Sequence, residues 1–249
     1  MTLEDKRALV TGASRGLGPA IALALATRGA RVAVNYLESP TVAEDVAAHL
    51  PKVSGGHMVV AGDVSSEGGS AAMIDAVVES FGGLDILVNN AGPFGATPLS
   101  EVGEEEWDRV IDVNLKGTWL CTRAAIPYMR RAGWGRVINI SAVSANVRNR
   151  ASYGLAKSAV EVLTEELAVE MGPFATVNAV APGQIQESLA EMESIDDAWA
   201  AAVTDRTPRH RLVTRQEVAD VVATICSENF QAMTGTTLHL DGGLRLNRF

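Results

Sequence analysis

The sequence predicts a doubly wound α/β fold, in which helices cover both faces of a seven-stranded, mainly parallel sheet. Seven short apolar segments alternate with helical segments along the 249 residues, a pattern typical of βαβ units with right-handed crossovers. The apolar segments are nearly continuous, as expected for strands buried on both faces. Small or polar residues follow the strands at the edge where such sheets bind ligands: Gly12, Asp63, Asn89, Ser141 and Pro182. Together these observations predict a Rossmann fold.

The first predicted strand, at residues 8–10, leads through a glycine turn into a helix at residues 19–26. Gly12, Gly16 and Gly18 allow a tight turn and a close approach of the backbone to a ligand. The unpaired N–H groups at the start of the helix then point toward one place, which suits a pyrophosphate. The spacing G-x-x-x-G-x-G differs from the G-x-G-x-x-G of the general dinucleotide fingerprint.

Two other interpretations of this turn remain open. Residues 12–16 also match G-x-S-x-G, the nucleophile elbow of hydrolases. An elbow normally follows several strands, whereas this turn follows the first one, and it needs an acidic residue and then a histidine later in the chain. The turn could also be a plain connection between strand and helix.

The same patterns predict six more strands and five more helices. The strands are expected at residues 31–36, 57–62, 84–89, 136–141, 176–181 and 236–240, and the helices at 42–50, 70–81, from 104 onward, 152–171 and 215–227. We expect one domain over residues 1–249. Residues 184–211 are charged and weakly patterned, and we expect them to form a mobile lid over the substrate.

Composition excludes several classes of function. The net charge of -9 argues against binding to nucleic acid, which needs a basic patch. Cys121 and Cys226 are isolated, which fits reduced thiols and a cytoplasmic protein, and no apolar signal segment or membrane span is expected. Four scattered histidines give little support to a metal site.

Tyr153 and Lys157 are four residues apart on a predicted helix and therefore share a face. A free phenol has a pKa of about 10, and a nearby cation lowers that value by stabilising the phenolate. The pair is therefore a candidate proton donor and acceptor for a carbonyl or an alcohol. Taken alone, the same spacing also occurs on ordinary amphipathic helices.

Further motifs accompany this pair, and with them the whole chain resembles the short-chain dehydrogenase/reductase family. It looks most like the 3-oxoacyl-[acyl-carrier-protein] reductases. The motifs that carry the resemblance are Thr11-Gly-Ala-Ser-Arg-Gly-Leu-Gly18, Asp63-Val64, Asn89-Asn-Ala-Gly92, Asn114, Tyr153-x-x-x-Lys157, Pro182-Gly183 and the ending Thr234-Gly-Thr-Thr-Leu-His-Leu-Asp-Gly-Gly243.

The resemblance implies a role for most of these residues. Asn114 would hold a water in a proton relay to Lys157, and Lys157 would also bind the nicotinamide ribose. Asp63 would accept a hydrogen bond from adenine. The implied cofactor site comprises Gly12, Ser14, Arg15, Gly16, Leu17, Gly18, Tyr36, Asp63, Val64, Asn90, Ala91, Gly92, Tyr153, Lys157, Pro182, Gly183 and Ile185.

The chain departs from the family pattern at two positions. Ala142 stands where the family has its catalytic serine, and the segment from there to Tyr153 is about two residues shorter than usual. Alternation along a strand slightly favours Ser144 as the substitute, whereas the distance from Tyr153 favours Ser141. Glu187 stands where the family has a threonine near the nicotinamide carboxamide.

The residues at the end of the second strand indicate whether the cofactor is NAD or NADP. NAD sites place a carboxylate there, but this strand ends Asn35-Tyr36-Leu37, with no acidic residue until Glu38. Arg15 can reach a ribose 2′-phosphate. We therefore expect NADP, with NAD as the alternative.

These features predict an oxidoreductase that reduces a 3-oxoacyl group or small ketone by hydride transfer, with Tyr153 as proton donor. The substrate would be a small-molecule or acyl-linked carbonyl compound. The alternatives are an enoyl reductase and a cofactor-binding family member whose catalysis is weakened by Ala142. The helix at 152–171 is apolar on more than one side, and the family pairs this helix across a two-fold axis, so a homotetramer is expected.

Overall fold

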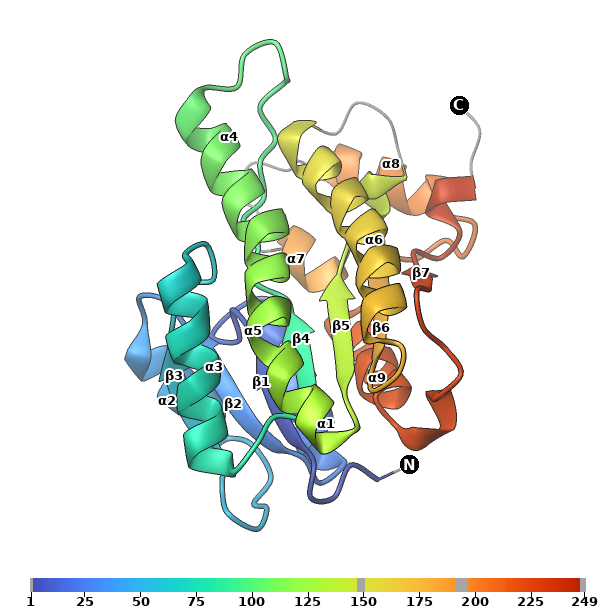
Figure 1. The fold of residues 1–249 in the computed structure, drawn as a ribbon. Helices are drawn as coiled ribbons and strands as arrows, with labels where there is room; N and C mark the ends of the chain where they lie inside the picture. The colour runs from blue at the N-terminus through green and yellow to red at the C-terminus, as the bar shows by residue number, and fades with distance from the viewer. Residues whose placement is uncertain (1, 147–150, 191–196, 247–249) are drawn as a thin grey trace.

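The seven strands form one sheet in which every neighbouring pair is parallel, in the order β3-β2-β1-β4-β5-β6-β7 (Figure 1). The computed structural model describes residues 2–146, 151–190 and 197–246. The strands are β1 (Arg7–Val10), β2 (Arg31–Tyr36), β3 (Met58–Ala61), β4 (Ile86–Asn89), β5 (Arg136–Ile140), β6 (Thr176–Pro182) and β7 (Thr237–Leu240). The predicted fold class is therefore confirmed.

Helices cover both faces of the sheet. On the face in front in Figure 1 lie α3 (Glu67–Phe81), α5 (Gly117–Ala132) and α6 (Ala151–Met171), and behind it lie α1 (Gly18–Thr27), α2 (Pro40–Ala48) and α9 (Arg215–Ile225). Each face has its own apolar cluster, one built around Ile21, Leu25 and Val222 and the other around Met73, Met129 and Met171. Strands β5 and β6 are buried along their whole length, including their polar residues Asn139 and Asn178, because helices cover both faces of the sheet.

The chain reverses its direction of winding between β1 and β4. These two strands are neighbours in the sheet although β2 and β3 come between them in the sequence. At such a switch point the loops after the two strands leave toward opposite faces, which opens a crevice beyond their carboxyl ends. The glycine turn follows β1 and Asn90 follows β4, so both lie at this crevice.

The helix predicted from Glu104 onward is interrupted. It consists of α4 (Glu104–Ile111), a π-helical turn (Asp112–Lys116) and α5. The extra residue per turn shifts the helix face at that point, and Asn114 lies inside the turn, fully buried.

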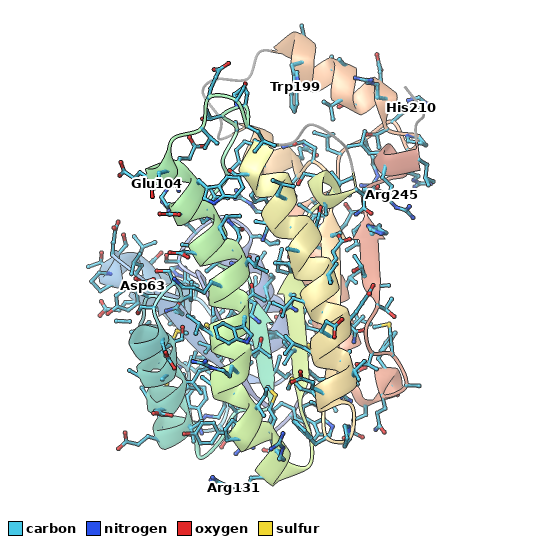
Figure 2. The ribbon with its side chains drawn as sticks, turned by 45° about the horizontal axis from the view of Figure 1, so that its top comes forward. Asp63, Glu104, Arg131, Trp199, His210 and Arg245 are labelled. Carbon is cyan, nitrogen blue, oxygen red and sulfur yellow. The ribbon has the colours of Figure 1, made fainter. Side chains whose placement is uncertain are left out.

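The region predicted to be a lid contains α7 (Gln186–Ala190) and α8 (Asp197–Arg206), whereas residues 191–196 lie outside the described part. Figure 2 shows Trp199 of α8 and Glu104 of α4 at the end of the molecule away from Arg131. The lid function stays a prediction. Within the described ranges, no helix is long and apolar enough to cross a membrane, and no three acidic, histidine or cysteine side chains gather as a metal site would require.

Candidate active site

A cavity of about 640 Å³ lies beyond the carboxyl ends of the strands. It runs from the glycine turn past the loops after β2, β3 and β4 to the first part of α6 and the loop after β6. Of the predicted site residues, those lining it are Gly12, Ser14, Arg15, Gly16, Leu17, Asp63, Val64, Asn90, Ala91, Gly92, Ser141, Tyr153, Lys157, Pro182, Gly183 and Ile185.

The glycine turn is held rigidly at one end of this cavity. Gly12 has φ of +58°, and a Cβ there would lie 2.9 Å from the Cα of Ala91, so only glycine fits without a shift. The Gly12 N–H donates to Asn35 Oδ1 at 2.9 Å, and Asn90 Nδ2 donates to the carbonyls of Thr11 (2.9 Å) and Gly12 (3.1 Å).

Helix α1 begins directly after this turn. Its N-cap, Leu17, makes no side-chain capping hydrogen bond, so the first N–H groups of α1 have no cap. These donors, together with the positive end of the helix dipole, fit a diphosphate group.

Tyr153 and Lys157 lie one helical turn apart on α6, both facing the cavity. Lys157 Nζ donates to the carbonyl of Ile140 at 2.7 Å and lies 5.5 Å from the centre of the Tyr153 ring. Burial raises the pKa of Tyr153 to about 12 and lowers the pKa of Lys157 to about 8. The direction for Tyr153 is opposite to the lowering expected from the sequence, because removal of the phenol from water disfavours the phenolate.

Asn114 does not line the cavity but lies directly behind it. Its Nδ2 donates to the carbonyls of Pro93 (3.0 Å) and Val110 (2.9 Å), while its buried Oδ1 has no hydrogen-bond partner among the described residues. A Cβ on Gly92 would collide with that Oδ1 and lie 3.4 Å from Lys157 Nζ. An acceptor and a cation thus meet across Gly92, an arrangement that fits a bridging water.

Neither serine brings its hydroxyl to the position of Ala142. Ser141 is buried and donates to Glu161 Oε1 at 2.8 Å, with a longer contact to the Lys157 carbonyl at 3.3 Å. Ser144 does not line the cavity, and its buried hydroxyl has no partner among the described residues. The alternation argument for Ser144 fails because β5 ends at Ile140 and a 3₁₀ turn (Val143–Ala145) follows.

The first turn of α7 brings Ser188 to the cavity, whereas Glu187, at the family's threonine position, is not among the lining residues. Glu187 accepts hydrogen bonds from the backbone N–H of Arg215 at 3.1 and 3.2 Å, which turns its carboxylate toward the start of α9. Ser188 lines the cavity instead, and its Oγ accepts from Arg215 Nη2 at 3.3 Å. Sequence reasoning missed Ser188 because it lies one residue beyond the family position.

Two further predicted cofactor residues lie away from the cavity. Tyr36 packs against the core behind the sheet. A Cβ on Gly18 would lie 2.6 Å from the Cα of Ala13, so this glycine allows α1 to pack closely under the turn. Some residues line the cavity only because of the tertiary structure, and sequence patterns do not identify them. They are Ser39, Gly62, Pro93, Arg109, Val113 and Ile140.

Comparisons with known proteins agree with this geometry. The family model described as "Enoyl-(Acyl carrier protein) reductase" matches residues 12–245. The 3-oxoacyl-[acyl-carrier-protein] reductase FabG of Staphylococcus aureus is 40% identical over 242 residues, which cover 96% of this chain and 98% of that protein. The 3-oxoacyl-[acyl-carrier-protein] reductase of Synechocystis is 38% identical over 241 residues, covering 95% and 96%.

Two solved structures are similar over nearly the whole chain. A putative short-chain alcohol dehydrogenase from Sinorhizobium meliloti has a TM-score of 0.93 and 33% identity, covering 99% of both chains. A gluconate 5-dehydrogenase from Burkholderia cenocepacia, in complex with NADP and tartrate, has a TM-score of 0.91 and 29% identity, covering 99% of this chain and 98% of that one. With its fold, its glycine turn and its Tyr153–Lys157 pair, the chain belongs to the short-chain dehydrogenase/reductase family of NAD(P)-dependent oxidoreductases.

Proposed function

We propose that the protein reduces the carbonyl of a 3-oxoacyl thioester or a small ketone to an alcohol, with NADPH as reductant and Tyr153 as proton donor. The observation that carries this proposal is the convergence of the glycine turn, Tyr153 and Lys157 on one cavity. The Staphylococcus and Synechocystis relatives, both 3-oxoacyl-[acyl-carrier-protein] reductases, support an acyl-linked substrate.

The side chains of the cavity have complementary roles in this reaction. A bound nicotinamide cofactor would supply a hydride to the carbonyl carbon. Tyr153 would donate its phenolic proton to the carbonyl oxygen, so that C=O becomes CH–OH and a phenolate remains. Since burial disfavours that phenolate, it needs the charge of Lys157 nearby. Asn114 Oδ1 would hold a water through which a proton returns to the tyrosine.

Two charged residues bear on the choice of cofactor. Arg15, in the glycine turn, and Glu38, just beyond the end of β2, both line the cavity. A guanidinium favours a 2′-phosphate, whereas a carboxylate favours free ribose hydroxyls. We propose that Arg15 decides the preference for NADP, in line with the NADP complex of the Burkholderia relative.

One observation favours a second function, that of a cofactor-binding protein with weak catalysis. Ala142 lines the cavity without a hydroxyl, and the Ser141 hydroxyl is held by Glu161. The enoyl reductase alternative rests on the description of the matching family model.

One experiment separates these functions. Oxidation of NADPH is followed spectrophotometrically with an acetoacetyl thioester and, separately, with a crotonyl thioester. The proposed function predicts turnover of the first only, its loss in Tyr153→Phe, and an unchanged Kd for NADPH in that variant. Turnover of crotonyl thioester would identify an enoyl reductase, and tight NADPH binding without turnover of either would identify the binding protein.

The same assay tests the role of Arg15. Arg15→Ala should weaken NADPH binding at least tenfold and leave NADH binding nearly unchanged, since only NADPH carries the 2′-phosphate. An equal loss of affinity for NADPH and NADH would show that Arg15 does not bind the 2′-phosphate.

A further inference from the structure

The loop between β4 and α4 holds an exposed aromatic ring against the proposed proton donor. The rings of Phe94 and Tyr153 meet edge to face, with their centres 5.1 Å apart and their planes at 68°. Phe94 nevertheless remains 56% exposed. The neighbouring residue, Pro93, lines the cavity. One part of the ring therefore covers Tyr153, while a large apolar surface beside the reacting centre remains open.

The backbone holds Phe94 in place from both sides. On one side, the Pro93 carbonyl accepts a hydrogen bond from the buried Asn114 side chain at 3.0 Å. On the other, Gly95 packs so closely that a Cβ there would lie 2.8 Å from Val110 Cγ2 and 3.3 Å from Ser152 Oγ. The position of the ring is thus set by contacts with the helices that carry the site.

The loop is also tied down further along. Thr97 Oγ1 donates to Glu106 Oε2 on α4 at 2.7 Å, which occupies that carboxylate oxygen. An exposed aromatic ring on an anchored loop loses little conformational freedom when a ligand covers it, so the burial of its surface contributes almost fully to binding.

We propose that Phe94 forms the apolar wall of the substrate site and selects carbonyl compounds whose substituent at the reacting carbon is an alkyl chain of several carbons or an aryl ring. This inference rests on the proposed function. A carbonyl oxygen that reaches the Tyr153 hydroxyl brings its own substituents next to the ring that covers Tyr153. A methyl group is too small to cover that surface, and a charged substituent would lose its hydration against it.

The test compares three 3-oxoacyl thioesters of N-acetylcysteamine, whose substituents on the reacting carbon are methyl, heptyl and phenyl. The wild type should have a higher kcat/KM for the heptyl and phenyl compounds than for the methyl compound. Phe94→Ala should raise KM for these two about tenfold, with little change in kcat or in KM for the methyl compound, because a hydrophobic contact of this size is worth about a factor of ten. Phe94→Leu should restore part of the loss.

Leu99 supplies the matched control. It lies on the same loop, five residues after Phe94, and is likewise exposed, at 52%. Leu99→Ala should leave all three KM values unchanged, and the Kd for NADPH should be the same in every variant. An equal loss on all three thioesters in Phe94→Ala, or no loss on any, would overturn the inference.

Binding without turnover distinguishes failure of this inference from failure of the proposed function. In Tyr153→Phe protein saturated with NADPH, calorimetry gives the Kd of the heptyl thioester with and without the added Phe94→Ala change. A tenfold difference supports the apolar wall even if the wild type reduces none of the thioesters. Equal Kd values would refute it even if all three are reduced.

Discussion

Ala142 lines the cavity at the place where the resemblance to the family implies a catalytic serine. A hydroxyl at this place would donate to the substrate oxygen as negative charge develops there, and loss of one such donor typically costs about a hundredfold or more in rate. The Ser141 hydroxyl is held by Glu161, and Ser144 lies off the cavity. We therefore expect that no serine replaces the missing group.

Restoring that hydroxyl should raise the rate. Ala142→Ser is expected to increase kcat/KM by one to two orders of magnitude with a small effect on the Kd for NADPH. Ser144→Ala is the matched control and should change neither quantity. A large loss of kcat/KM in Ser144→Ala would show that Ser144 is the donor after all.

Lys157 makes the free energy of unfolding depend on pH. Its pKa is about 8 in the folded protein against an ordinary value of 10.5, so the unfolded chain holds this proton more tightly. Lys157 therefore lowers the free energy of unfolding below pH 8. This loss of stability becomes smaller as the pH rises from about 8 to 10.5.

The expected result is a stability gain in Lys157→Met that depends on pH. Urea unfolding should find the variant more stable than the wild type at pH 7, with a difference that shrinks toward pH 10. Comparing two proteins that differ at one residue cancels the other titrating groups. A difference that stays constant over this range would mean that Lys157 titrates normally.

Single residues also show where sequence reasoning reaches its limit. Tyr153 and Lys157 could be placed on one face because a regular helix fixes the relation between residues four apart. The orientation of Ser144 could not be predicted, because a 3₁₀ turn stands where the prediction assumed a continuing strand. Ser188 takes its position from Arg215, a residue far away in the sequence.

At the scale of elements, the strands and most helices follow from hydrophobic periodicity, but the π-helical turn at Asp112–Lys116 does not. A regular helix would make a full set of i to i−4 hydrogen bonds, so the turn needs compensation from elsewhere. Asn114 supplies it by donating to the carbonyls of Pro93 and Val110. The first of these lies on another segment, and no local pattern in the sequence reveals it.

The contact between α7 and α9 gives a prediction about the cofactor. Glu187 caps the first turn of α9, and this contact, together with that between Arg215 and Ser188, fixes the turn that places Ser188 at the cavity. Both Ser188→Ala and Glu187→Ala should raise the Kd for NADPH, by about fivefold for one lost hydrogen bond. Titration of NADPH fluorescence measures this.

A nearby exposed residue, Gln186, serves as the control for the contact between α7 and α9. Gln186→Ala changes the same turn of α7 without touching either contact and should leave the Kd unchanged. If Glu187→Ala binds NADPH as the wild type does while Ser188→Ala does not, the serine acts without the support of α9.

At the scale of the whole molecule, one exposed face carries a stripe of apolar side chains. Leu155, Val162 and Val169 of α6 are 47%, 58% and 81% exposed, and their spacing of seven residues aligns them along the helix. Figure 1 shows α5 beside α6 on this face, and Trp119 of α5 is also partly exposed. A stripe of this kind is typical of helices that pack against another subunit.

We predict that this face joins copies of the chain into a homotetramer. The wild type should have four times the mass of one chain by light scattering at tens of micromolar. Val162→Glu places a charge in the middle of the stripe and should lower the mass to that of a dimer or monomer, because an unpaired carboxylate is costly to bury. Val42→Glu, on the exposed side of α2 and 46% exposed in the wild type, is the matched control and should leave the mass unchanged. A monomeric wild type, or an unchanged mass in Val162→Glu, would contradict the prediction.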